Sequence, residues 1–306
     1  MANVTGLKSG QTGTKHINIK IPTSGTTPVN AVAAVGTLTL GGVVVDGDTC
    51  TIDTDVYEFA ADAAQTVTSG NTAVDITSYV TASSGTLTVD TQATADDTMT
   101  IGTKEYTFVA DGSEADDGDI SVGTDLATCQ ANIVAAINGT DTINTANTFA
   151  SAGAFAANDS TITALVGGTV GDAIATTETF TAATNVFAAA TLGSGADCSA
   201  ANAITALVAA EVTGATYTLA DSTGDTMTVT YNTKGVIGNS VATTETFTTA
   251  SNVFDAATLG TTTAGVNGTI AENGTCFIDN TYLYYCIDDN TIADNYWRRI
   301  ALGSAY

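Results

Sequence analysis

Basic residues are scarce in this 306-residue chain: seven Lys and Arg stand against 32 Asp and Glu, which gives a net charge of −25. Nucleic acids and anionic membranes both bind basic surfaces, so this balance argues against either as a partner. No apolar run reaches 18 residues, and none follows Met1, so neither a membrane span nor a Sec-type signal peptide is predicted. These features fit synthesis in the cytoplasm.

Residues that usually carry catalysis are also few. The single histidine, His16, has no neighbouring residues that would form a catalytic triad, and there is no P-loop, dinucleotide-binding or HExxH motif. The five cysteines are odd in number and show no CxxC spacing, so we expect reduced core residues rather than a disulfide framework. We therefore predict a protein that is not an enzyme and that holds no cofactor and no metal.

One acidic loop, residues 111–119, keeps an alternative open. Its five carboxylates are oxygen ligands of the kind that Ca²⁺ requires, although their spacing departs from the EF-hand pattern. The simpler interpretation is a solvated turn between a strand and a helix.

Proline is almost absent as well, with two residues against 30 glycines, and threonine, which favours strands, is abundant. This composition predicts many strands joined by tight turns, that is, a mainly β fold with a few helices (α+β). Two helices are predicted from apolar residues at helical spacing, 125–139 after Asp125 and 199–214 after Ser199, each ending at a glycine.

Internal repetition is the strongest organising feature. The stretches 175–193 and 242–260 agree at 16 of 19 positions, and the segments 36–59 and 85–108 share a second frame. These frames predict two related hairpin–helix–hairpin units, with Gly171 and Gly238 in the tight turns of the closing hairpins. The order of the parts favours nesting over a tandem array of three decayed units, because the opening segments both precede the helices. The predicted domains are an arm (1–35), an outer unit in two halves (36–83 and 194–269), an inserted unit (84–193) and a C-terminal module (270–306).

The arm is basic, whereas the rest of the chain is acidic. Residues 1–30 hold three lysines and no acid, so the remaining residues, with 32 acids and four bases, carry −28. The alternation in HINIKIP (16–22) predicts a strand, which could join the sheet of another subunit or lie at an edge of its own domain. The residues that we expect to dock on an acidic partner are Lys8, Lys15, Ile17, Ile19, Lys20 and Ile21.

The C-terminal module is rich in aromatic residues and holds both arginines of the chain. Its strand at 282–287 is apolar on both faces and must be covered on both, so the module is expected to pack on its own body or on a neighbouring subunit. The candidate packing or oligomer residues are Tyr282, Tyr284, Tyr285, Trp297, Arg298 and Arg299.

The frames at 36–59 and 98–109 and the repeated G-[DN]-x-[IV]-ATTETF resemble repeats in virion structural proteins of tailed bacteriophages. The pattern Y-L-Y-x-C…W-R-R-I-x-L, at Tyr282 to Leu302, resembles a C-terminal module of phage fibre-like and decoration-type proteins. The resemblance covers residues 36–306 and implies a virion location. Its implied partners are the major capsid protein or other virion proteins and further copies of the chain, most simply in a trimer.

Two functions are then expected. The first is a capsid-surface protein, of decoration or head-fibre type, that docks by its arm and projects its acidic units. The alternative is a tail fibre or tail-tip accessory protein whose units bind a host-surface glycan through exposed aromatic residues.

Overall fold

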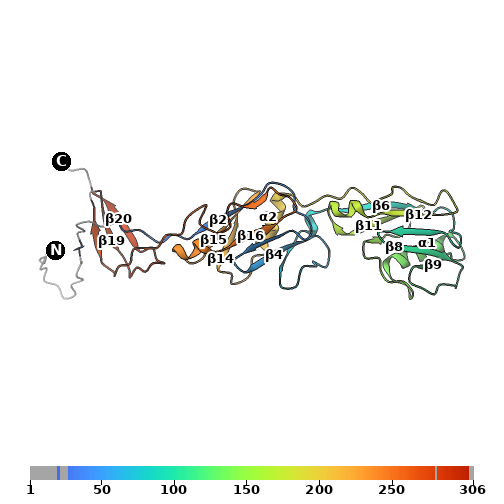
Figure 1. Ribbon diagram of the computed structural model, residues 1–306, viewed down its shortest axis with the longest axis horizontal. Helices are drawn as coiled ribbons and strands as arrows, with labels where there is room; N and C mark the ends of the chain where they lie inside the picture. Colours follow the sequence, from blue (N-terminus) through green and yellow to red (C-terminus); the bar gives the residue numbers. More distant parts are fainter. Residues whose placement is uncertain (1–18, 21–26, 280, 303–306) are drawn as a thin grey trace.

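The computed structural model describes residues 19–20, 27–279 and 281–302, which form three bodies in a row (Figure 1). We name them the end module, the middle lobe and the distal lobe. The described residues contain five four-stranded sheets and two α-helices, so the predicted mainly β fold is confirmed. No helix among them is long and apolar enough to cross a membrane.

The middle lobe is built from residues on both sides of the distal lobe in the sequence. Its first sheet has the order β14-β15-β2-β17 and its second the order β16-β3-β4-β5, with helix α2 beside them. The bounds are β2 Val35–Leu40, β3 Thr49–Ile52, β4 Asp55–Ala60, β5 Thr72–Asp75, α2 Ala200–Ala209, β14 Tyr217–Asp221, β15 Thr226–Tyr231, β16 Thr243–Thr246 and β17 Asn252–Phe254.

The distal lobe repeats this strand order with one continuous segment. Its sheets have the orders β10-β11-β6-β13 and β12-β7-β8-β9, and helix α1 contacts β9 and β10. The bounds are β6 Ala82–Thr88, β7 Thr98–Ile101, β8 Lys104–Val109, β9 Asp119–Ser121, α1 Leu126–Asn138, β10 Ala150–Ala152, β11 Asp159–Gly167, β12 Thr176–Glu178 and β13 Val186–Phe187.

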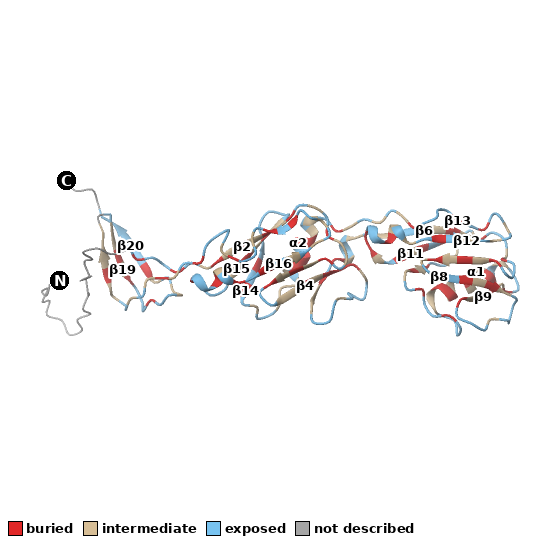
Figure 2. Cartoon of the chain, in the orientation of Figure 1, coloured by how far each residue is buried: buried red, intermediate tan, exposed pale blue. Residues whose placement is uncertain are grey.

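Each lobe has a hydrophobic core of its own, and the end module has a third, smaller one (Figure 2). The cores form because threonine and apolar residues alternate along the strands: in β2, Gly36, Leu38 and Leu40 are buried while the residues between them are partly exposed. The middle core draws on residues 34–76 and 198–259, and the distal core on 87–192. That each lobe folds as an independent domain, and that the lobes arose by duplication, stay predictions.

The first predicted helix is confirmed. Helix α1 begins after Asp125, whose carboxylate accepts a hydrogen bond from the backbone N–H of Thr128, and ends at Gly139, which has a φ of 61°. Helix α2 begins after Ser199 as expected but ends at Ala209, before the predicted Gly214. The helix ends there because the backbone N–H of Val212 donates to the Tyr57 hydroxyl at 3.2 Å rather than to a carbonyl of the helix. The carboxylate of the neighbouring Glu211 accepts from the N–H of Leu219 at 2.6 Å.

The predicted closing hairpins were wrong in their pairing. Strands β11 and β12 are joined by a 3-10 helix, η2 (Thr169–Ala173), and lie in different sheets, as do β15 and β16 around η3 (Val236–Ser240). The hairpin that follows each helix is instead β10–β11 or β14–β15. The left-handed glycines are Gly168 and Gly235, at φ of 95° and 109°, rather than Gly171 and Gly238.

Candidate functional site

The end module unites the start and the finish of the described chain. Its sheet has the order β1-β18-β19-β20, formed by Ile19–Lys20, Cys276–Ile278, Tyr282–Cys286 and Trp297–Ala301. Strand β1 is parallel to β18, with Ile19 opposite Cys276 and Lys20 opposite Phe277. The two described residues of the strand predicted at 16–22, Ile19 and Lys20, therefore lie at a sheet edge of their own chain. The other predicted docking residues, Lys8, Lys15, Ile17 and Ile21, and the histidine His16, lie outside the described residues.

Trp297 holds the end module to the segment that leads into the middle lobe. The Asn30 side-chain amide accepts a hydrogen bond from the Trp297 N–H at 3.0 Å and donates one to the Trp297 carbonyl at 3.1 Å. The indole N–H of Trp297 donates to the carbonyl of Thr269 at 2.8 Å. The ring is only 4% exposed. Trp297 thus binds the segment of Asn30 through its backbone and the segment of Thr269 through its indole ring.

Asn290 makes the corner before the last strand. Its side chain, 2% exposed, donates to the carbonyl of Thr269 at 2.7 Å and accepts from the N–H of Tyr296 at 2.8 Å. By binding backbone groups of both Thr269 and Tyr296, the amide stabilises the turn that brings β20 back to β19.

Four of the six predicted module residues line one groove of about 500 Å³, which Pro28 and Asn30 complete. Tyr284 and Trp297 form its buried part, and Arg298 and Arg299 are exposed. Tyr282 lies beside the groove under the guanidinium of Arg299, at 4.5 Å from the ring centre. The sixth residue, Tyr285, does not line the groove and lies opposite Cys276 and Arg298 in the sheet.

Asp279 sets the electrostatics beside the groove. The backbone N–H groups of Thr281 and Tyr282, each at 2.7 Å from the carboxylate, hold the pKa of Asp279 below its usual value of 3.8. Burial of the Tyr284 hydroxyl away from solvent raises its pKa, and the neighbouring Asp279 carboxylate raises this pKa further. Tyr284 is therefore a neutral hydrogen-bonding group near a carboxylate and two guanidinium groups, which suits the binding of a polar surface.

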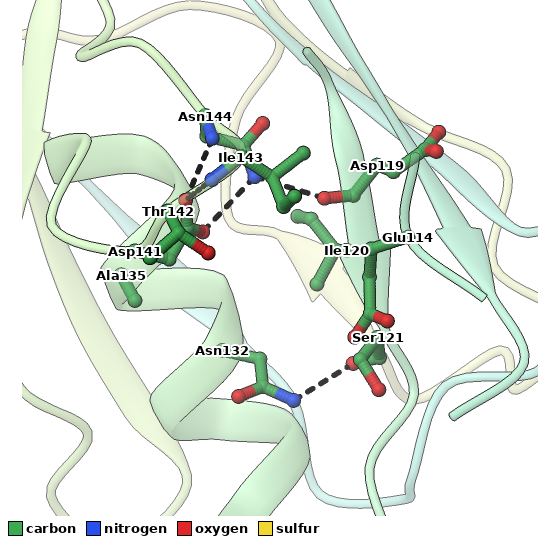
Figure 3. A pocket seen from close by; sticks show the side chains of 10 residues that line it. All are labelled: Glu114, Asp119, Ile120, Ser121, Asn132, Ala135, Asp141, Thr142, Ile143 and Asn144. Atoms are coloured by element: carbon green, nitrogen blue, oxygen red, sulfur yellow. Dashed lines mark hydrogen bonds between the residues drawn. The ribbon is translucent and has the colours of Figure 1, made fainter. Parts of the chain in front are cut away.

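A second hollow, of about 270 Å³, lies in the distal lobe between α1, β9 and the loop that follows the helix (Figure 3). Its polar groups bind one another: Asn144 donates from its side chain to the carbonyl of Asp119 at 2.9 Å, and Asn132 donates to the carbonyl of Ser121 at 3.1 Å. Burial alone would raise the pKa of Asp141, but hydrogen bonds from Asn144 and Ile143 hold it below 3.8. Among the described residues every buried side-chain N and O atom has a hydrogen-bond partner, so no buried unsatisfied group in the hollow points to a ligand.

The acidic loop 111–119 uses its carboxylates within the lobe. Asp117 forms an ion pair with Lys104 at 2.7 Å, and Asp119 accepts from the N–H groups of Ala115 and Asp116 at 2.9 and 3.0 Å. Asp111 accepts from the hydroxyl of Ser121 at 2.9 Å. Across the part of the chain that the structure describes, no cluster of three or more His, Cys, Asp or Glu side chains could hold a metal ion.

All five cysteines are free and buried. Burial raises the pKa of the Cys50 thiol to about 12 and that of the Cys198 thiol to about 11. A thiol is nucleophilic as the thiolate, so these two side chains act as small core residues near neutral pH.

Buried polar networks were missed at the sequence level. Asp48 and Asp97 are each 2% exposed, and each binds backbone N–H groups of its own lobe. In the middle core the Tyr217 hydroxyl donates to Asp55 at 2.7 Å and lies 2.8 Å from the Tyr57 hydroxyl. A signal was present for the two aspartates, because each stands directly before the T-x-T-I strand of a repeated frame.

The comparisons with known proteins add no relative. No protein-family model, no curated protein and no solved structure matches this chain. The functional interpretation therefore rests on the residues and the geometry described above.

Proposed function

We propose that this chain is a virion structural protein of a tailed bacteriophage, most simply a capsid-surface protein of decoration or head-fibre type. One observation carries the proposal: the first and last described strands, β1 and β20, belong to the same sheet, and the two lobes extend from it in a row (Figure 1). A protein that attaches at one end and projects from a particle needs this arrangement. The resemblance of residues 36–306 to phage virion repeats supports the same assignment.

The distribution of charge supports attachment through the end module. Residues 36–264 hold 27 acids and two lysines, whereas the remainder of the chain holds five acids and five bases. The acidic lobes repel one another and any acidic shell, so contact with other virion proteins is least opposed at the neutral end. The groove of Tyr284, Trp297, Arg298 and Arg299 lies in this part of the chain.

Copy number in purified particles tests the proposal. Quantitative mass spectrometry should find hundreds of copies per virion if the protein covers the capsid. A handful of copies would favour the alternative, a tail fibre or tail-tip accessory protein that binds a host glycan. Absence of the chain from virions would refute both.

A truncation tests the arm separately. Deleting residues 1–17 removes Lys8, Lys15 and Ile17 but leaves β1 and the contacts of Asn30 with Trp297 in place. We expect the truncated protein to lose binding to isolated empty capsids while its circular dichroism is unchanged. The control Lys234→Gln removes one positive charge from the middle lobe and should bind normally. Full binding by the truncated protein would exclude residues 1–17, and with them Lys8, Lys15 and Ile17, from docking.

A further inference from the structure

The three bodies are joined at two junctions, and the backbone hydrogen bonds at the two junctions follow the same pattern. At the distal junction, Thr81 lies opposite Ala196, the N–H of Gly168 donates to the carbonyl of Thr81 at 3.0 Å, and Thr169 N–H donates to the carboxylate of Asp197 at 2.7 Å.

At the junction with the end module, Val32 lies opposite Val266 and Gly235 N–H donates to the carbonyl of Val32 at 2.9 Å. Val236 N–H there donates to the side-chain oxygen of Asn267, also at 2.9 Å. The backbone partners therefore correspond one to one between the two junctions.

The exposed side chains differ between these matched positions. Where the distal junction has exposed Thr81, Thr169 and Ala196, the end-module junction has valines that are 39%, 51% and 39% exposed. At the distal junction, threonine and alanine stand at the matched positions and the same backbone hydrogen bonds form. The backbone of the end-module junction therefore does not require valine at these three positions. Directly opposed residues of an antiparallel pair share a face, which places Val32 and Val266 side by side.

Three exposed isoleucines lie in the segments that form this junction: Ile237 follows Val236, Ile270 follows the segment of Val266, and Ile292 binds that segment through its carbonyl. Ile237, Ile270 and Ile292 are 59%, 71% and 50% exposed, and the carbonyl of Ile292 accepts a hydrogen bond from the N–H of Gly268, beside the valine pair. We call the six residues Val32, Val236, Ile237, Val266, Ile270 and Ile292 the aliphatic collar. A cluster of exposed aliphatic side chains of this kind marks a surface that is covered by a partner.

Charge identifies the partner. The lobes carry a net −25 between residues 36 and 264, and the rest of the chain is neutral. Side-by-side packing of two chains along their lobes would bring strongly acidic surfaces together. Residues 27–35 and 265–302, which hold four of the six collar residues, carry five acids and two arginines, a net charge of only −3.

We propose that the aliphatic collar is the self-association surface of this protein, and that its occupant is the collar of a second copy. The proposal deepens the function proposed above, because a homo-oligomer joined at the collar presents several attaching ends together and lets the acidic lobes diverge. The groove residues of the end module then remain available to a different virion protein.

The test exchanges the collar for the side chains of the matched junction. The variant Val32→Thr/Val236→Thr/Val266→Ala carries the residues that the distal junction already accommodates. Sedimentation velocity and light scattering of the wild-type chain should give a multiple of 30.6 kDa, with three copies expected. The variant should dissociate to the monomer, with an association at least about 100-fold weaker. The control Val170→Thr changes a 58% exposed residue of the distal lobe and should leave the mass unchanged.

A second variant guards against loss of folding. Ile237→Asn/Ile270→Asn changes two side chains that are more than half exposed, so circular dichroism and melting should stay at wild-type values while the mass falls. A monomeric wild-type protein, or a wild-type mass in both folded variants, would overturn the collar proposal. These outcomes are independent of the number of copies in virions, so a failed collar and a failed virion assignment can be told apart.

Discussion

Asp97 offers the sharpest test of how each lobe is held together. One carboxylate oxygen accepts hydrogen bonds from the backbone N–H of Thr181 at 2.8 Å and from its hydroxyl at 2.7 Å. The other oxygen accepts from the N–H of Thr94 at 2.8 Å. This one side chain therefore ties the turn before β7 to the segment that follows β12. The change to examine is Asp97→Ala.

The expected cost follows from the groups that lose a partner. Asp97 is 2% exposed, and the substitution removes the acceptor of two backbone N–H groups, those of Thr94 and Thr181. A hydrogen bond to a charged group contributes about 1.5–3 kcal/mol, so losing the two bonds from backbone N–H groups costs about 3–6 kcal/mol. For a lobe of this size, that loss lowers the melting temperature by roughly 10 °C or more.

The middle lobe contains a matched site. Asp48 accepts from the N–H of Thr248 at 2.7 Å and from the N–H of Val45 at 3.0 Å, and it is also 2% exposed. Because the two lobes have separate cores, differential scanning calorimetry should show Asp97→Ala lowering one transition and Asp48→Ala lowering another.

The control for the aspartate variants is Glu105→Ala, which removes one negative charge from an exposed position on β8. It should change the melting temperature by only a degree or two. If Asp97→Ala shifts the melting no more than this control, the hydrogen-bond argument is refuted. If both aspartate variants lower one and the same transition, the lobes do not unfold as separate domains.

Two further predictions concern individual groups. Tyr217→Phe removes the hydroxyl that binds Asp55 and Tyr57, so the free energy of unfolding of the middle lobe in urea should fall by about 1–3 kcal/mol. The control is Tyr231→Phe, at a partly buried tyrosine packed against the same core. A fall no larger than that of the control would contradict the prediction. The pKa of Asp117 is about 2, first because Lys104 donates to it and then because the Thr145 N–H does, so its ionised form stabilises the lobe above pH 3.8 and this contribution is lost as the pH falls toward 2. Lys104→Met should raise that pKa toward 3.8 in an NMR titration, and an unchanged value would exclude the ion pair as its main cause.

Local signals in the sequence predicted the elements that depend on local chemistry. Asp125 and Gly139 bound helix α1 because a capping carboxylate and a left-handed glycine act within one turn. The alternation of threonine with apolar residues located β2 and its buried face in the same way. Helix α2 ends early because distant groups, the N–H of Leu219 and the hydroxyl of Tyr57, bind Glu211 and Val212.

Local sequence signals could not predict which strands pair with one another in a sheet. An alternating strand has the same pattern whichever neighbour it binds, so β11 and β12 read as a hairpin although they lie in different sheets. The collar was missed for a related reason: Val32, Val236 and Val266 look like core residues in the sequence. Only the matched junction, with threonine or alanine at these places, distinguishes a side chain that the fold needs from one that it leaves exposed.

The contacts of the doubled stretch, 175–193 and 242–260, explain why its residues agree. Thr181 and Thr248, at the same place in each copy, donate their N–H groups to Asp97 and Asp48. Phe180 lies 5.4 Å from Phe108, and Phe247 lies 6.0 Å from Phe59, both in tilted pairs. Leu192 and Leu259 occupy the space where a side chain at Gly85 or Gly36 would otherwise stand. Each copy therefore binds the opening strands of its own lobe. A substitution on either side of these contacts would leave a buried polar group without its hydrogen-bond partner or overfill the core. Packing and hydrogen bonding thus give a physical reason for the agreement between the two copies at these positions.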